Sequence, residues 1–179
     1  MNVQLKDISD PVLKKAGEAL YFAQRMEHSL ITHLLVREKI SEKVISAEMI
    51  HDIEARVRNE KATFGTLIKK LDNQLGVEPP QSSFEEALHY RNFLVHNIFG
   101  KYRRGAGSVR FNRRMLVDLE IIVLEFQCTV DLLQNWTQGL AMTHGIDITQ
   151  IESEYEKSSI FDTEHEYIKP TDLVPRTRK

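Results

Sequence analysis

The chain has 179 residues with 24 basic and 26 acidic side chains, and its net charge of −2 gives the whole molecule no electrostatic preference for nucleic acid. A single cysteine excludes an internal disulfide and indicates a reducing, cytoplasmic location. No apolar run approaches the roughly 18 residues of a membrane span, and the first residues lack the apolar core of a secretory signal. The length predicts one domain followed by a tail.

The spacing of apolar residues predicts an all-α fold, a bundle of about five helices with short connections. The expected helices cover residues 10–39, a segment that begins at Ser46, and residues 64–75, 84–99 and 113–144. Two of them have clear start signals. Asp10 and Pro11 suit the cap and the first turn of a helix, while Ser83 and Glu86 have the spacing of a capping box. Asn112 is the expected cap of the last helix, and Gly145 its end.

The last predicted helix is apolar over more than one face, which favours a central place in the bundle with Cys128 in the core. Residues 1–145 therefore form the predicted bundle domain. Residues 146–179 are first acidic and then basic, and we expect them to form an irregular tail.

Two charged residues interrupt apolar helical stripes. Arg91 falls in the middle of the stripe of the helix over residues 84–99, and Glu27 falls in the middle of the stripe of the first helix. A guanidinium in such a position costs several kcal/mol unless it is paired. The pattern predicts that Glu27 and Arg91 form a structural ion pair or share one polar pocket.

Asn92 and His96 lie one predicted turn apart, and with the long Arg91 side chain they can border one cleft. Glu85 and His89 extend this polar row. His89 and His96 lie two turns apart, which does not suit tight metal ligation, and no second helix offers a Glu-x-x-His motif, so we expect no metal and no cofactor. Tyr90 and Phe93 fall on the far side of the helix and are expected to be exposed. Such aromatics predict a further packing surface, such as a subunit contact.

A basic stretch follows this helix. No acidic residue occurs between Glu86 and Asp118, and Tyr102 and Phe111 are interleaved with the cations. Such a patch suits a phosphate backbone, although a solvated connection has the same composition. The expected RNA-binding residues are Lys101, Arg103, Arg104 and Arg110. Nothing indicates recognition of a DNA sequence.

The segment from Arg91 to His96, read as Arg-Asn-Phe-Leu-Val-His, resembles the Arg-x4-6-His motif of HEPN domains. The segment AQRMEHSL is similar to part of the first helix of small bacterial HEPN-like proteins. The resemblance implies a helical bundle that dimerises and brings two motifs into one composite cleft. It also implies roles for three residues: His96 as general acid or base, Arg91 as stabiliser of the phosphorane charge, and Asn92 as an orienting group.

The resemblance implies a metal-independent endoribonuclease that acts as a homodimer, as in toxin–antitoxin systems and phage defence. The alternative is a non-catalytic helical interaction or regulatory protein with the same fold and a protein partner. Under the first hypothesis, His96→Ala and Arg91→Ala abolish RNA cleavage in EDTA. Under the second, His96→Ala folds and binds normally, whereas Arg91→Ala unfolds the chain by leaving Glu27 unpaired.

Overall fold

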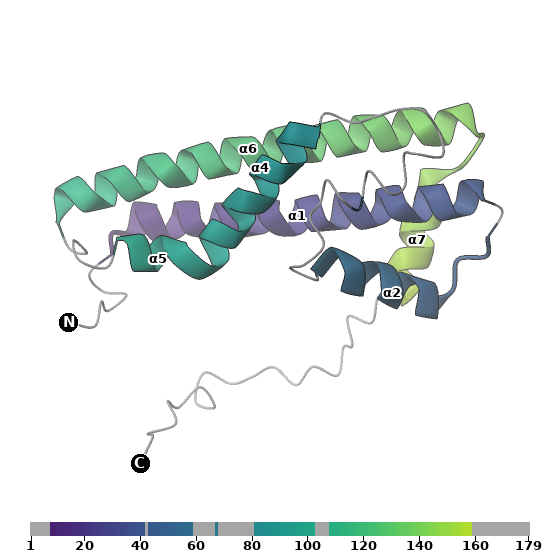
Figure 1. The fold of residues 1–179 in the computed structure, drawn as a ribbon, viewed down its shortest axis with the longest axis horizontal. Coiled ribbons are helices and arrows are strands. Elements are labelled where there is room, and N and C mark those ends of the chain that lie inside the picture. Colours follow the sequence, from purple (N-terminus) through teal and green to yellow (C-terminus); the bar gives the residue numbers. More distant parts are fainter. Residues whose placement is uncertain (1–7, 42, 59–66, 68–80, 103–107, 159–179) are drawn as a thin grey trace, which may run out of the picture.

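The computed structural model describes residues 8–41, 43–58, 67, 81–102 and 108–158, and every regular element in these ranges is helical (Figure 1). The elements are α1 (Asp10–Ile40), α2 (Ala47–Arg58), α4 (Gln81–Asn92), the π-helical segment η2 (Phe93–Asn97), α5 (Ile98–Lys101), α6 (Val109–Thr143) and α7 (Ile148–Ser158). The predicted all-α bundle is therefore confirmed. The helix expected over residues 64–75 lies outside the described residues, apart from residue 67.

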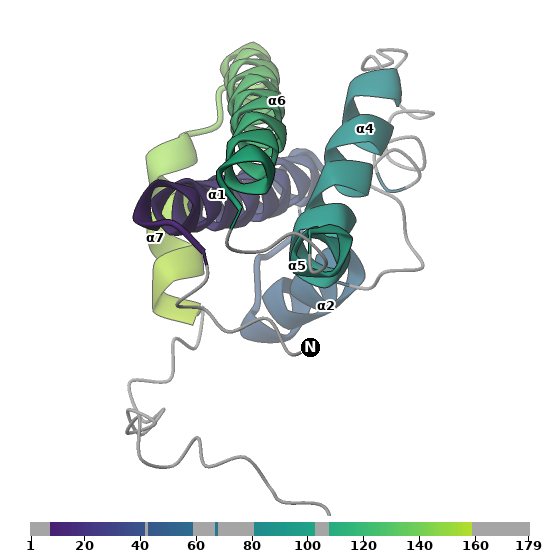
Figure 2. The ribbon, with the colours of Figure 1, turned by 90° about the vertical axis from the view of Figure 1, so that its left-hand side faces the viewer.

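The two longest helices, α1 and α6, run side by side in the same direction and form the centre of the fold (Figures 1 and 2). The small residues Ala16, Ala19 and Ala23 of α1 are buried and allow close approach of the two backbones. Fully buried large side chains of both helices fill the space between them: Met26, Leu30, Leu35, Leu119, Ile122, Phe126 and Leu133.

The shorter helices cover two sides of this pair. The helix α4 crosses α1 and α6 obliquely, while α2 and α7 lie near the C-terminal end of α1 (Figures 1 and 2). Phe84 and Ala87 anchor α4 in the core, and Ile50 and Ile53 anchor α2. Among the described residues, no helix is long and apolar enough to cross a membrane.

The helix α6 begins at Val109, earlier than the sequence pattern predicts. Ser108 is the cap in place of Asn112, because its side chain accepts a hydrogen bond of 3.3 Å from the backbone N–H of Phe111. At the other end, Gly145 adopts a φ of 64°, and the N–H of Ile146 bonds to the carbonyl of Ala141 at 2.9 Å. This left-handed turn ends the helix where the glycine predicts it.

Residues 148–158 are helical, although the sequence pattern predicts an irregular tail from residue 146. Ile151 and Tyr155, one turn apart on α7, are both buried in the core. The Tyr155 hydroxyl donates a hydrogen bond of 3.0 Å to Glu54 of α2, and Asp147 accepts from the N–H of Thr149 at 2.9 Å. These contacts order a segment whose charged composition hides its short apolar stripe. Residues 159–179 lie outside the described residues.

The helix α6 is long and central, but the described elements, chiefly α1 and α4, leave one of its faces uncovered. Cys128 is exposed, so its predicted place in the core is wrong. Leu124 and Val117 are exposed as well. The second apolar face that favours burial in the sequence therefore lies at the surface of the described bundle.

Candidate functional site

Glu27 of α1 and Arg91 of α4 lie opposite each other, as their positions in the two apolar stripes predict. The Nε and Nη2 atoms of Arg91 lie 3.0 and 2.9 Å from Glu27 Oε1. The third guanidinium nitrogen, Nη1, donates to Asn92 Oδ1 at 3.2 Å. The two charged side chains are only 18% and 22% exposed. The guanidinium is thus held by partners within its own chain.

The helix that carries His96 is not a regular α-helix. Residues 93–97 form a π-turn, in which the N–H of Ile98 bonds to the carbonyl of Phe93, five residues earlier. This wider turn changes the direction in which the residues after Asn92 point. His96 lies exposed on η2, whereas Leu94 and Ile98 remain in the core.

Tyr90 and Phe93 are half-buried and pack against the core, so the prediction that they are exposed is wrong. Together with His89, Ile121 and Ile122 they line a small cavity between α4 and α6. A wheel of 3.6 residues per turn considers each helix alone and does not include this neighbour. The predicted aromatic packing surface is thereby explained within the chain.

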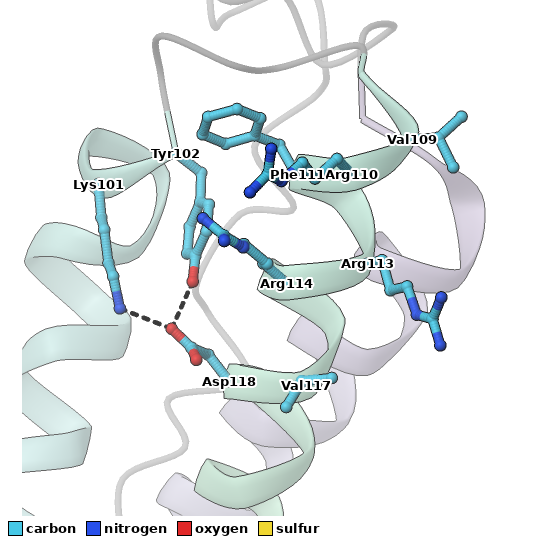
Figure 3. A pocket seen from close by; sticks show the side chains of 9 residues that line it. All are labelled: Lys101, Tyr102, Val109, Arg110, Phe111, Arg113, Arg114, Val117 and Asp118. Atoms are coloured by element: carbon cyan, nitrogen blue, oxygen red, sulfur yellow. Dashed lines mark hydrogen bonds and ion pairs between the residues drawn. The ribbon is translucent and has the colours of Figure 1, made fainter.

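The basic stretch forms the walls of a cavity of about 970 Å³ at the N-terminal end of α6, here named the α6 pocket (Figure 3). Nine residues line it: Lys101, Tyr102, Val109, Arg110, Phe111, Arg113, Arg114, Val117 and Asp118. Four of them are cationic and only one is acidic. Of the expected RNA-binding residues, Lys101 and Arg110 lie here, and Arg103 and Arg104 lie outside the described residues.

Asp118 ties one wall of the α6 pocket to the other (Figure 3). Its carboxylate accepts hydrogen bonds from Lys101 Nζ at 2.7 Å and from the Tyr102 hydroxyl. Burial favours a higher pKa of Asp118, but these two bonds outweigh it and hold the pKa below its ordinary value. The bond to Asp118 raises the pKa of Lys101, and burial followed by the same carboxylate raises that of Tyr102. The charge of Asp118 is therefore already compensated.

Three arginines of the first two turns of α6 have no ion-pair partner among the described residues. Arg110 and Arg114 point toward Tyr102, and Arg113 points away from it (Figure 3). The first turn of α6 contains no acidic residue. The exposed guanidinium groups of Arg110 and Arg114 thus lie on the side of the α6 pocket that Tyr102 forms.

One buried histidine, which lies between α1 and α6, was not predicted from the sequence pattern. His33 is 1% exposed, stacks on Trp136 with ring centroids 4.3 Å apart, and lies with Nδ1 3.0 Å from Thr137 Oγ1. Thr137 donates its hydroxyl proton to the carbonyl of Leu133 at 2.6 Å, so His33 Nδ1 must be the donor to Oγ1. His33 Nε2 is then an acceptor, and it has no partner within the described residues.

This environment keeps His33 neutral. Burial, followed by the positive charge of Arg37 one turn away, lowers its pKa to about 3. The flanking apolar residues Ile31 and Leu34 were a signal for burial, but the partners Trp136 and Thr137 are more than 100 residues away in the chain.

The fold and these sites define a class: an all-α helical-bundle protein with a basic pocket at the start of its second long helix. The chain is similar to the protein described as iron-sulfur cluster assembly factor IBA57 homolog, mitochondrial, of Kluyveromyces lactis. The two are 27% identical over 187 residues, a match that covers 95% of this chain and 38% of that protein. The chain thus spans well under half the length of this relative. No family model matches the chain, and no solved structure matches it.

These comparisons correct the HEPN prediction. No family model matches, and the relative reported above is described as an iron–sulfur cluster assembly factor rather than a nuclease. The HEPN resemblance rests on residue types that are common on helices, which explains why a short motif was misleading. The endoribonuclease prediction, its toxin–antitoxin and phage-defence contexts, and the alternative of a regulatory interaction module are withdrawn with it. The relative is described as mitochondrial, so the cytoplasmic location remains a prediction.

Proposed function

We propose that this chain binds a phosphate-bearing anionic ligand in the α6 pocket. The observation that supports the proposal is the pair of exposed guanidinium groups, Arg110 and Arg114, on one side of a cavity whose single carboxylate is already bonded to Lys101 and Tyr102. The pocket therefore has a surplus of positive charge, on a protein whose overall charge is −2. An anion is the ligand that such a surplus attracts.

The chemistry of the walls favours phosphate over other anions. A planar guanidinium donates two parallel hydrogen bonds, which match two oxygens of one phosphate group. The N-terminal end of the 35-residue helix α6 adds the positive end of the helix dipole. Tyr102 and Phe111 meet edge to face with ring centroids 6.5 Å apart, and they form an aromatic wall next to the cations. A phosphate ester with a ring, such as a nucleotide, fits this combination of groups.

Titration calorimetry with a nucleoside triphosphate tests the proposal. We expect Arg110→Ala and Arg114→Ala each to weaken binding about tenfold, because each removes a charge-assisted hydrogen bond. Arg25→Ala, at an exposed site of α1 outside the pocket, is the matched control and should leave the affinity unchanged. If the double variant binds as tightly as the wild type, the α6 pocket is not the site.

A short single-stranded RNA distinguishes two sources of the same phosphate chemistry. Binding of RNA in preference to the triphosphate, with a logarithmic affinity that falls steeply with salt, assigns the pocket to a nucleic-acid backbone. Binding of the triphosphate alone assigns it to a free nucleotide. The absence of both at low salt contradicts the proposal.

The similarity over 95% of the chain favours a second function, participation in iron–sulfur cluster assembly, which the description of the relative assigns to that protein. A cluster is ordinarily held by four cysteine thiolates, and this chain has one cysteine, Cys128. Within the described residues, no three histidine, cysteine or acidic side chains are grouped to hold a metal. The chain would therefore act together with proteins that supply the ligands.

Deletion of the gene tests this second function. We expect iron–sulfur enzymes in the deleted cells to lose activity while metal-free enzymes keep theirs. Because one thiol cannot hold a cluster, the Cys128→Ser variant should restore the activity as well as the wild type does. Unchanged activity of the iron–sulfur enzymes after deletion would exclude the role.

A further inference from the structure

The helix α6 carries a second apolar stripe on its outer face. Val117, Ile121 and Leu124 are 48%, 48% and 61% exposed, and Cys128 continues the row as an exposed thiol. We name these four residues the outer stripe. Their spacing of four, three and four residues is the spacing of the contact positions in a coiled coil. Ordinary surface helices have polar residues at such positions.

The mean direction of the outer stripe is away from the core, although Ile121 also lines the small cavity between α4 and α6 and Val117 also lines the α6 pocket. At about 100° per residue, its mean direction is opposite to that of Leu119, Ile122 and Phe126, which pack in the core. Figures 1 and 2 place α1 on one side of α6 and no described element on the opposite side. An apolar row along three turns is thus left about half exposed by the described part of the chain.

We propose that the outer stripe is the contact surface of a homodimer in which the two α6 helices pack antiparallel. Reversal of the stripe about its midpoint maps it onto itself: Val117 meets Cys128 of the second copy, and Ile121 meets Leu124 of the second copy. Each layer then pairs two different positions of the repeat, as in antiparallel coiled coils. A surface that complements itself in this way suits the two-fold symmetry of most homodimers.

The charges next to the outer stripe favour a second copy in this orientation. Arg113 precedes the stripe by four residues and Asp131 follows it by three, and both side chains are exposed on the same flank of α6. The reversal that pairs Val117 with Cys128 brings Arg113 of one copy next to Asp131 of the other. A parallel pair would place the two Arg113 side chains at the same level on opposite sides of the seam, far from Asp131 of either copy.

This interface shares Arg113 and Val117 with the rim of the α6 pocket, but it leaves Arg110 and Arg114, the two arginines of the proposed ligand site, free. Arg113 points away from Arg110 and Arg114, which face Tyr102 (Figure 3). The dimer inference therefore does not depend on the proposed function, and loss of the dimer is measurable without any ligand.

Light scattering of the full chain over a range of micromolar concentrations is the first test. We expect a dimer for the wild type and a monomer for the double variant Ile121→Glu and Leu124→Glu, whose helical content should equal that of the wild type because both residues are exposed. Val95→Glu is the matched control, since Val95 is a half-exposed apolar residue of η2 outside the stripe. A wild-type chain that stays monomeric at all concentrations overturns the proposal. Its stripe is then covered by another protein or by its own residues.

Disulfide formation tests the orientation. The variant Val117→Cys places a thiol opposite Cys128 of the second copy, and a mild copper oxidant should link the two chains, whereas the wild type should stay unlinked. The two cysteines of one chain are about 16 Å apart along the helix, too far for a disulfide. A Cys128–Cys128 link in the wild type would instead indicate parallel helices and would contradict the model.

A charge exchange provides a second measure of the same orientation. Arg113→Glu alone places two acids together at each end of the seam and should weaken the dimer at least fivefold. The addition of Asp131→Arg restores the opposite charges and should recover most of the affinity. Failure of the second change to rescue the first would exclude antiparallel packing.

Discussion

As the pH falls from about 6 to about 4, the free energy of unfolding of the protein is expected to decrease by about 1.4 kcal/mol per pH unit through His33 alone. The folded state holds the pKa of His33 at about 3, because the ring is buried and Arg37 is close. The unfolded chain returns this pKa to about 6.5. The unfolded state therefore binds the proton more strongly, and acid favours unfolding.

The sign follows from the lowered pKa of a base. The stability contributed by neutral His33 is complete above about pH 6.5 and is lost as the pH falls toward 3. Protonation would place a second donor, Nε2–H, in a site where Nε2 has no partner among the described residues. Trp136 and Thr137, the facing groups of α6, carry no charge that could compensate an imidazolium.

Urea unfolding at several pH values measures this effect. His33→Gln keeps an amide donor for Thr137 and removes the titration, so its stability should fall less steeply between pH 6 and pH 4 than that of the wild type. His144→Gln, at an exposed site just after α6, is the matched control and should follow the wild-type slope. Equal slopes for the wild type and His33→Gln would show that His33 does not titrate as proposed.

The second large effect is expected from the ion pair of Glu27 and Arg91. Arg91→Ala should destabilise the protein by about 2 kcal/mol, because the Glu27 carboxylate loses its hydrogen bond and its ion pair while it remains only 22% exposed. This value lies below the roughly 3–5 kcal/mol of a fully buried pair, since water still reaches both groups. The sequence pattern predicts that this variant unfolds, whereas the partial exposure of both groups predicts a folded but less stable variant.

A double-mutant cycle isolates the pair. Glu27→Ala, Arg91→Ala and the double variant should give a coupling energy of about 2 kcal/mol from urea midpoints at constant m-value. Asn92→Ala should cost less, about 0.5–1.5 kcal/mol, because it removes one bond of 3.2 Å. Gln24→Ala, at an exposed site of α1, is the control. A coupling energy near zero would mean that the pair does not contribute to stability.

The ion pair of Glu27 and Arg91 shows what can be predicted from apolar periodicity in the sequence. The sequence alone shows which side of a helix an apolar stripe occupies. Glu27 and Arg91 each interrupt such a stripe at its centre. The structure brings the two residues together although 64 positions separate them. The direction of the His96 side chain cannot be obtained in the same way. His96 lies in η2, whose π-turn departs from 3.6 residues per turn, so a regular helical wheel gives its direction incorrectly.

The sequence by itself determined the helical class, the start of α1 at Asp10, the end of α6 near Gly145 and the two charges inside apolar stripes. These are local properties, since capping residues and apolar periodicity act over a few turns. The tertiary structure alone decided that His33 lies on Trp136, that α7 is ordered by Tyr155, and that the outer stripe of α6 with Cys128 stays exposed. Periodicity shows which helix faces are apolar, whereas the packing of segments distant in the chain decides which of those faces are covered.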